Sequence, residues 1–389
     1  MLIVGLLIAT TLVVFVDAGS WKLHIRKVKR VQRNNTLGPL HDIYREVLNF
    51  DRAHYRATIY VGTPPQPFQV MIDTGSHILW IPKKGCKAKG RNTVGNCKTG
   101  KYVYNFAESA SAEDLHVPFT VAYGDGSSKM KGQYFKDVFS FGEKMRLKET
   151  VTFGVVHEMT DEDQGILGLG NAIDPNERGS SIIHEAWRQK VIDAPVFTIY
   201  LRKCPDSEDC EKFGTITIGS HDTEMCGKIE GHVKVVPDSI FWLFEVTSFK
   251  LGPASISKPF KTITGALTNR RFLIHVFTDS GAPGIYVPKD TYKQLMEAIK
   301  ATRTIWGGYV VRCTAYVAIS LSINGREYVV PGNQLLVNLH TGICALRLNP
   351  FDSSDGSWIL GSPFMRTYCV VHNVDTQAIG FAPALTRYD

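Results

Sequence analysis

The sequence predicts a mainly β protein built from two related β-rich lobes. The first observation is an apolar phrase that occurs twice, at residues 71–82 and 277–288, with an Asp-(Thr/Ser)-Gly inside each copy. The second is an Ile-Leu-Gly phrase that follows each copy, at 166–168 and 359–361. Two phrases that recur in the same order indicate a duplicated structural unit.

The length and composition agree with two lobes of mostly β-structure. The chain has 389 residues, of which 44% are hydrophobic and only 21% charged, so it has enough apolar material for a large core. Segments rich in Val, Ile, Phe, Tyr and Thr alternate with turn residues and predict strands, for example at 68–72, 119–123, 196–201 and 328–330. Helical patterns are few and short, and the clearest cover 180–189 and 291–301.

The first 18 residues have the pattern of a secretory signal peptide. Leu2 to Val16 is an apolar run, and small residues suited to cleavage follow near Ala18. The alternative is an uncleaved membrane anchor, which would need about 20 apolar residues to cross roughly 30 Å of hydrocarbon. Because this run is shorter, we expect residues 1–18 to be removed and no membrane span to remain.

Residues 19–50 form a basic segment that we expect to be a propeptide. The segment holds seven Lys or Arg against Asp42 and Glu46, which accounts for much of the chain's formal charge of +7. Apolar and cationic residues alternate at 22–33, a pattern that suits a strand lying across an acidic surface. The plainer alternative is a solvated leader with no inhibitory role. The rest of the chain shows no basic stripe with aromatic platforms, so we expect no nucleic-acid partner.

Asp73 and Asp279 are candidates for a pair of catalytic carboxylates. Two adjacent carboxyl groups that share one proton supply both a base to activate water and an acid to protonate a substrate, because like charges a few ångströms apart cannot both ionise easily. A single Asp-Thr-Gly is usually an ordinary β-turn, but two copies in matching contexts favour the paired site. The sequence has no zinc-hydrolase, serine-hydrolase or phosphate-loop signature, so we expect no metal and no cofactor.

From about Ala57 to about Pro383, these motifs resemble the pepsin and cathepsin D family of aspartic proteases. The resemblance implies a bilobal pepsin-like fold with a central cleft between an N-terminal lobe at 51–193 and a C-terminal lobe at 194–389. It also implies an aspartic endopeptidase that is made as a zymogen, is inhibited by its own propeptide and cleaves polypeptide substrates in extended conformation. We expect a monomer in the secretory pathway, either secreted or lysosomal.

The resemblance assigns roles to individual residues. Asp73 and Asp279 would form the catalytic dyad, and the hydroxyls of Thr74 and Ser280 would bond to the opposite loop. The hairpin 119–134 would be a mobile flap that closes over the substrate. The remaining residues of the predicted site are the dyad-supporting Gly75, Ser76 and Gly281, the flap residues Tyr123, Gly124 and Asp125, the flap partner Trp80 and a substrate contact at Tyr200.

Eight cysteines behind a signal peptide indicate an oxidising compartment and up to four disulfides. Two pairs follow from the resemblance, namely Cys86 with Cys97 and Cys313 with Cys344. The sequence leaves three connectivities open for the other four cysteines. Among these the favoured pairs are Cys204 with Cys210, across a predicted hairpin turn, and Cys226 with Cys369.

The chain departs from the family after its second Asp motif, where Ala282, Pro283 and Gly284 stand in place of common hydroxyl residues. An alanine here removes a hydrogen bond to the ionised carboxylate. We therefore expect the upper pKa of the pair to rise and the activity optimum to be less acidic than that of pepsin. At the flap tip, Asp125 would favour basic substrate side chains unless it is simply a solvated turn residue.

Two other functions stay open at this point. One is a catalytically weak or silent peptide-binding protein that kept the fold and lost turnover, for which Ala282 and Pro283 leave room. The other is a secreted structural or surface-binding protein that uses the basic loop 83–101, which has only its charge in favour.

Overall fold

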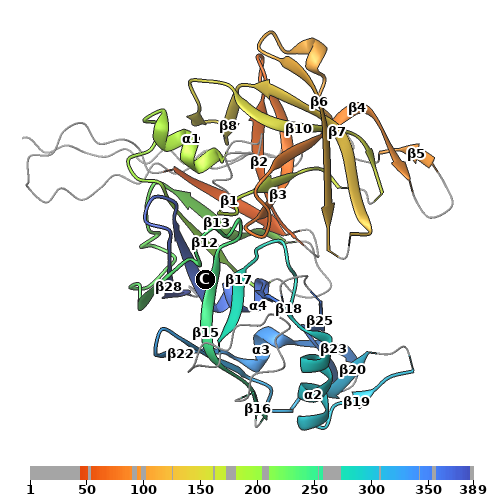
Figure 1. Cartoon of the computed structure of the whole chain (residues 1–389), viewed down its shortest axis with the longest axis vertical. Coiled ribbons are helices and arrows are strands. Elements are labelled where there is room, and N and C mark those ends of the chain that lie inside the picture. Colours follow the sequence, from red (N-terminus) through yellow and green to blue (C-terminus); the bar gives the residue numbers. More distant parts are fainter. Residues whose placement is uncertain are drawn as a thin grey trace, which may run out of the picture.

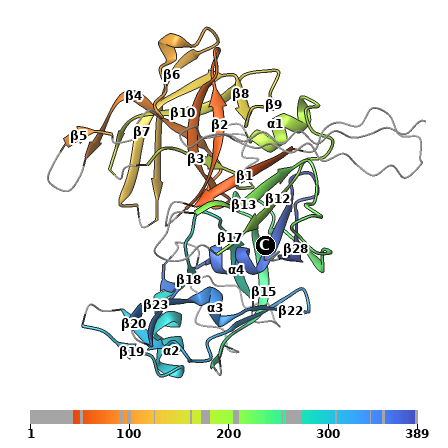
Figure 2. The same ribbon diagram turned by 180° about the vertical axis from the view of Figure 1, so that it is seen from behind.

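The computed structural model describes residues 44–385 except for 51–53, 90–93, 98–101, 125, 161–162, 172–180, 204–209, 253, 257–272, 306–307, 341 and 353–355. The predicted signal peptide, residues 19–43 of the predicted propeptide, and Asp125 therefore lie outside the described residues. The described part is mainly β, as predicted, and its sheets follow one another along the long axis (Figures 1 and 2). Within it, no helix is long and apolar enough to cross a membrane.

Most strands belong to one large sheet that runs through both halves of the chain. The strand order is β14-β28-β27-β12-β13-β1-β2-β3-β11-β4-β10-β7-β6, and β5, β8 and β9 pair with it off this path. Its N-terminal strands are β1 (Tyr44–Phe50), β2 (Tyr55–Val61), β3 (Gln66–Asp73), β4 (Leu79–Lys89), β5 (Val94–Asn96), β6 (Glu113–Tyr123), β7 (Ser128–Asp137), β8 (Phe139–Phe141), β9 (Met145–Arg146), β10 (Val151–Met159) and β11 (Ile166–Gly168). Its C-terminal strands are β12 (Val196–Leu201), β13 (Cys210–Ile218), β14 (Gly231–Lys234), β27 (Tyr368–Asn373) and β28 (Ala378–Pro383).

Two smaller sheets complete the C-terminal half. An eight-stranded sheet has the order β22-β21-β15-β17-β26-β18-β25, and β16 pairs with β15. Its strands are β15 (Leu243–Leu251), β16 (Ala254–Ile256), β17 (Ile274–Thr278), β18 (Ile285–Val287), β21 (Ile319–Ile323), β22 (Arg326–Val330), β25 (Leu348–Pro350) and β26 (Trp358–Leu360). A four-stranded sheet contains β19 (Thr302–Arg303), β20 (Tyr309–Arg312), β24 (Ile343–Leu346) and β23 (Leu336–His340).

The helices are short, as the sequence predicts. The two predicted segments contain or overlap α1 (Ile182–Arg188) and α2 (Lys289–Ala298). The sequence did not single out α3 (Gly332–Leu335), α4 (Ser362–Thr367) or the single 3₁₀ turn Phe106–Glu108, which are too brief to show an amphipathic period.

Each half contains the same three-stranded arrangement around its Asp motif. In the first half, β11 runs parallel to β3, which places Gly168 beside Asp73, and antiparallel to β4. In the second half, β26 runs parallel to β17, which places Leu360 beside Thr278, and antiparallel to β18. The two repeated sequence phrases are thus neighbouring strands of one structural unit that occurs twice.

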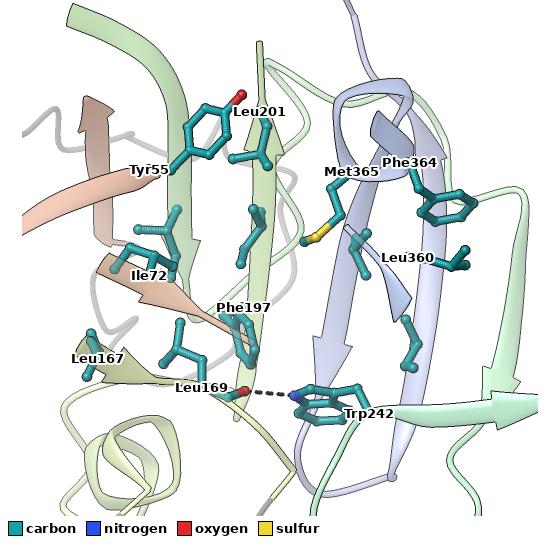
Figure 3. Packing of buried hydrophobic residues seen from close by; sticks show 14 of the residues in the cluster. Tyr55, Ile72, Leu167, Leu169, Phe197, Leu201, Trp242, Leu360, Phe364 and Met365 are labelled. Atoms are coloured by element: carbon teal, nitrogen blue, oxygen red, sulfur yellow. Dashed lines mark hydrogen bonds between the residues drawn. The ribbon is translucent and has the colours of Figure 1, made fainter. Parts of the chain in front are cut away.

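A continuous core joins the two halves. Figure 3 shows buried side chains of β2, β3 and β11 packing against others from β12, β26 and α4. At their meeting point, the fully buried indole Nε1–H of Trp242 donates to the carbonyl of Leu169 at 2.7 Å. Because a buried indole N–H needs a partner, this bond ties the start of β15 to the segment that follows β11.

Strand β1 lies within the segment that we expected to be the propeptide. It pairs antiparallel with β13, from Tyr44 opposite Ile218 to Phe50 opposite Cys210, and then with β2. The last seven residues of the range 19–50 are therefore an internal strand of the large sheet.

The disulfides in the described residues join Cys86 to Cys97, Cys226 to Cys369 and Cys313 to Cys344. All three are pairs that we predicted. The fourth predicted pair, Cys204 with Cys210, lies outside the described residues, because Cys204 is not among them. The pair formed by Cys226 and Cys369 ties the loop after β13 to β27 and so clamps the C-terminal strands of the large sheet.

Candidate active site

The two Asp motifs meet where the halves face each other. Asp73 ends β3, and Asp279 directly follows β17. A Cβ added to Gly75 would lie 2.5 Å from the carboxyl carbon of Asp279, and one added to Gly281 would lie 2.7 Å from Oδ1 of Asp73. Only glycine lets each loop approach the opposite carboxylate this closely.

Four hydrogen bonds between the loops fix their relative position. The hydroxyl of Thr74 accepts from the backbone N–H of Ser280 at 3.0 Å and donates to the carbonyl of Thr278 at 2.9 Å. The hydroxyl of Ser280 accepts from the N–H of Thr74 at 3.1 Å and donates to the carbonyl of Ile72 at 2.6 Å. Both hydroxyls are buried. Since each one uses both its donor and its acceptor on the opposite loop, the arrangement holds the two carboxylates at a fixed separation.

The local hydrogen bonds to the two carboxylates are not the same. Asp73 accepts from the N–H of Gly75 at 2.9 Å and from the hydroxyl of Ser76 at 2.5 Å. Asp279 accepts from the N–H groups of Gly281 at 2.8 Å and Ala282 at 3.2 Å. The position that corresponds to Ser76 is Ala282, so no hydroxyl reaches Asp279 from its own loop.

Asp279 is the carboxyl group whose surroundings favour the protonated form. Burial, then the charge of Asp73, then a side-chain hydrogen bond with Asp73 raise the pKa of Asp279 well above its ordinary value, and the two backbone N–H groups only partly oppose this. A hydrogen bond between two carboxyl groups requires one shared proton. The geometry therefore favours a pair in which Asp279 holds the proton and Asp73 accepts.

The predicted flap is the β6–β7 hairpin. Tyr123 ends β6, and Gly124 and Gly126 in the following turn have φ of 61° and 85°, backbone conformations that glycine adopts without strain. The phenol oxygen of Tyr123 accepts from the indole Nε1–H of buried Trp80 at 2.7 Å. Burial, followed by the charge of Asp73, raises the pKa of Tyr123, so the phenol stays neutral.

Tyr123 also lies close to the dyad. The hydroxyl of Ser76, which donates to Asp73, is a hydrogen-bond neighbour of the Tyr123 phenol. A continuous polar chain thus runs from Trp80 through Tyr123 and Ser76 to Asp73, and the position of the flap is linked to the carboxylate.

Tyr200 lies elsewhere, and its position does not support the substrate contact that we predicted. Its side chain is only 3% exposed and packs with Cys226, Cys369 and Ala382 inside the large sheet. The sequence of β12 could not reveal this, because nearly all of its side chains are buried, whichever face they lie on.

An apolar cluster next to the second Asp motif was not predicted from the sequence. Phe277 precedes Thr278 in β17, and its ring stacks on that of Phe241 at 4.7 Å between centroids. Ala282 packs in the same cluster, whose partly buried members include Tyr286 and Phe351. These aromatic residues come from distant parts of the chain, and no local pattern brings them together.

Comparison with known proteins identifies the family. A sequence model described as "Eukaryotic aspartyl protease" matches residues 54–384. The chain belongs to the eukaryotic aspartyl protease family. This aspartic protease is 28% identical to Aspartic protease 6 of Caenorhabditis elegans, over 90% of this chain and 86% of the relative. It is 27% identical to Cathepsin D of Chionodraco hamatus, over 86% of this chain and 82% of that protein.

The family accounts for the fold and for the class of enzyme. It is the mainly β pepsin-type fold that the sequence predicts, and the chain is an aspartic-type endopeptidase. Its substrates are therefore polypeptides. Among the described residues, no three His, Cys, Asp or Glu side chains gather in a way that could hold a metal ion.

Proposed function

We propose that the protein is an active endopeptidase that uses Asp73 and Asp279 to add water to a peptide bond. The observation that carries this proposal is the contact of the two Asp loops, where a side chain on Gly75 would overlap the carboxyl group of Asp279. The unequal hydrogen bonds support it further, because acid–base chemistry needs one charged and one protonated carboxyl group.

In the proposed reaction, Asp73 takes a proton from the water while the water oxygen attacks the peptide carbonyl carbon. Asp279 gives its proton to the carbonyl oxygen, which produces a neutral gem-diol. When the C–N bond breaks, Asp73 gives the proton that it took from water to the leaving nitrogen, and Asp279 takes a proton from a hydroxyl of the gem-diol, so that the products are a carboxylic acid and an amine. The proton count is balanced, and the dyad returns to its starting state with one proton.

The flap would hold the substrate in an extended conformation over the dyad. The hairpin β6–β7 has both glycines needed for a tight turn at its tip, and the bond between Tyr123 and Trp80 holds the residue next to that tip. The partly buried aromatic residues of the apolar cluster, Phe241, Tyr286 and Phe351, would contact an apolar substrate side chain. The site would therefore prefer peptides with an apolar residue next to the cleaved bond.

We also propose that the chain is made as a zymogen in the secretory pathway, either secreted or lysosomal. The disulfides support an oxidising compartment. The basic segment would cover the acidic cleft near neutral pH and be released when acid protonates carboxylates. Since β1 is paired inside the large sheet, the cleavage that releases the propeptide would precede Tyr44.

The decisive experiment is to follow self-shortening and hydrolysis of a denatured protein by purified residues 19–389 from pH 3 to 7. Asp279→Asn and the inhibitor pepstatin serve as controls. Acid-triggered activity that is lost in both controls supports the dyad, and sequencing of the new N-terminus locates the junction. A folded protein without activity across this range would instead favour the peptide-binding alternative, which Ala282 and Pro283 leave open.

The inhibitory role of the propeptide has a separate test. Removal of residues 19–43 leaves β1 and its pairing with β13 in the chain. The shortened protein should be active near neutral pH, where the full-length protein is not. Equal activity of the two at neutral pH would refute the inhibitory role without touching the proposal for the dyad.

A further inference from the structure

A buried histidine lies next to the strand that leads into Asp279, at the junction of the two halves. His372 is on β27, has no exposed surface and stacks almost parallel on Phe197 of β12, with 4.4 Å between ring centroids and an angle of 11°. Trp242 covers it from another side at 4.8 Å. Figure 3 shows Phe197 and Trp242 close together where the halves meet.

The imidazole contacts the strand that carries Asp279. Nε2 of His372 lies 3.3 Å from the hydroxyl of Thr278, which is the last residue of β17. Thr278 is itself fully buried, and its carbonyl accepts the hydroxyl of Thr74 from the opposite loop. One side of Thr278 is thus held by the imidazole and the other by the hydrogen bonds that join the two loops.

We propose that His372 is a positioning residue for Asp279, which it holds in place through Thr278. This inference rests on the proposed function of the dyad. Thr278 is β-branched, so a bond to its hydroxyl fixes its side-chain rotamer and with it the orientation of the backbone that leads into Asp279. A bond in a dry, closely packed site is also stronger than the same bond in water.

The surroundings of the ring support a neutral imidazole in this role. The elements packed against it contribute Phe197 from β12, Trp242 before β15, Thr278 from β17 and the paired Ile379 from β28, none of which carries a charge. The ionisable groups on β17 and its loop are His275, whose side chain is 46% exposed and lies 4.0 Å from Glu245, and Asp279, which follows Thr278. A neutral ring has one donor and one acceptor nitrogen, and either can pair with a hydroxyl.

A double-mutant cycle tests the proposal. His372→Phe keeps an aromatic ring for the stack but removes the nitrogen, and Thr278→Val removes the hydroxyl but keeps the carbonyl that Thr74 needs. We expect each change to lower kcat by about three- to tenfold, the usual effect of one hydrogen bond, with KM changed less than about twofold. The double variant should be no slower than the slower single variant.

Two further replacements distinguish positioning from simple packing. The terminal amide of Gln in His372→Gln can occupy the place of Nε2, whereas the shorter amide in His372→Asn corresponds to Nδ1 and does not reach Thr278. The Gln variant should therefore regain part of the lost kcat, and the Asn variant should not. Titration of active sites with pepstatin would correct each rate for the folded fraction.

Three results would overturn the inference: unchanged kcat in His372→Phe, additive effects in the double variant, or equal rates of the Gln and Asn variants. If His372→Phe does not fold, Thr278→Val and the comparison of Gln with Asn still decide the question. Failure of the proposed function looks different, because the wild-type protein itself would then hydrolyse no peptide.

Discussion

The buried histidine makes a quantitative prediction about stability in acid. Burial lowers the pKa of His372 from 6.5 to about 3. In the unfolded chain the imidazole takes up a proton as the pH falls below 6.5, whereas in the folded protein it does not until about pH 3. The stability that this group contributes is therefore complete above pH 6.5 and is lost progressively as the pH falls toward 3.

The magnitude follows from the two pKa values. Between pH 7 and pH 4.5 the unfolded state gains about 2.5 kcal/mol from protonation of this one group, and the folded state gains almost nothing. A phenylalanine cannot be protonated. The difference in unfolding free energy between His372→Phe and wild type should thus shift by about 2.5 kcal/mol in favour of the variant over this range.

Urea denaturation of both proteins at pH 7, 5.5 and 4.5, with pepstatin absent, measures the difference. Carboxylates titrate alike in the two proteins and cancel. His116→Gln provides a surface control, since the side chain of His116 is 82% exposed in the folded protein, where it lies 3.5 Å from Asp114. A difference between His372→Phe and wild type that stays constant with pH would refute the reasoning.

The remaining predictions concern the dyad and the flap. Asp279→Asn should fold and should bind pepstatin more weakly than the wild type. Its kcat should fall by at least roughly a thousandfold because the proton donor is lost. Appreciable turnover in a peptide assay would contradict the role assigned to Asp279. Ala282→Ser should bring a hydroxyl to Asp279, oppose the raised pKa of that carboxyl and move the alkaline limb of the kcat/KM profile to lower pH; an unmoved limb would count against it. Tyr123→Phe leaves the buried N–H of Trp80 without its acceptor, which costs about 1–3 kcal/mol, so kcat/KM should drop by roughly five- to 150-fold. An unaltered kcat/KM in steady-state kinetics with a peptide substrate would contradict this.

The parts of the fold that were predictable from sequence are those that repeat. The matching contexts of Asp73 and Asp279 indicated a duplicated unit, and the pairing of β11 with β3 and of β26 with β17 explains why. A repeat is visible because both copies must satisfy the same local packing, including a glycine where the opposite carboxyl group comes close. Contacts made once, between remote segments, leave no such signal.

Tyr200 and His372 illustrate that limit. Both lie on strands of the large sheet, and the choice of face depends on how β12 and β27 pair with each other and with their neighbours. The alternation of polar and apolar residues does not help where both faces are buried. The sequence also did not show that β1 is a strand of the large sheet, because β1 directly follows a basic segment and was assigned to the propeptide with it.

If Asp73 and Asp279 form the proposed dyad, Asp279 and the buried histidine together would limit the pH at which this protease works. Asp279 would have to keep its proton, and burial without a hydroxyl from Ala282 would extend that condition toward higher pH. His372 must stay neutral, and its burial makes the folded state less stable as the pH falls. The first effect moves the alkaline limit of activity upward, and the second moves the acid limit of the folded protein upward as well. Two independent features, one at the dyad and one below it, thus favour an optimum less acidic than that of pepsin, and the acid limit would be set by unfolding rather than by the chemistry of the carboxyl pair.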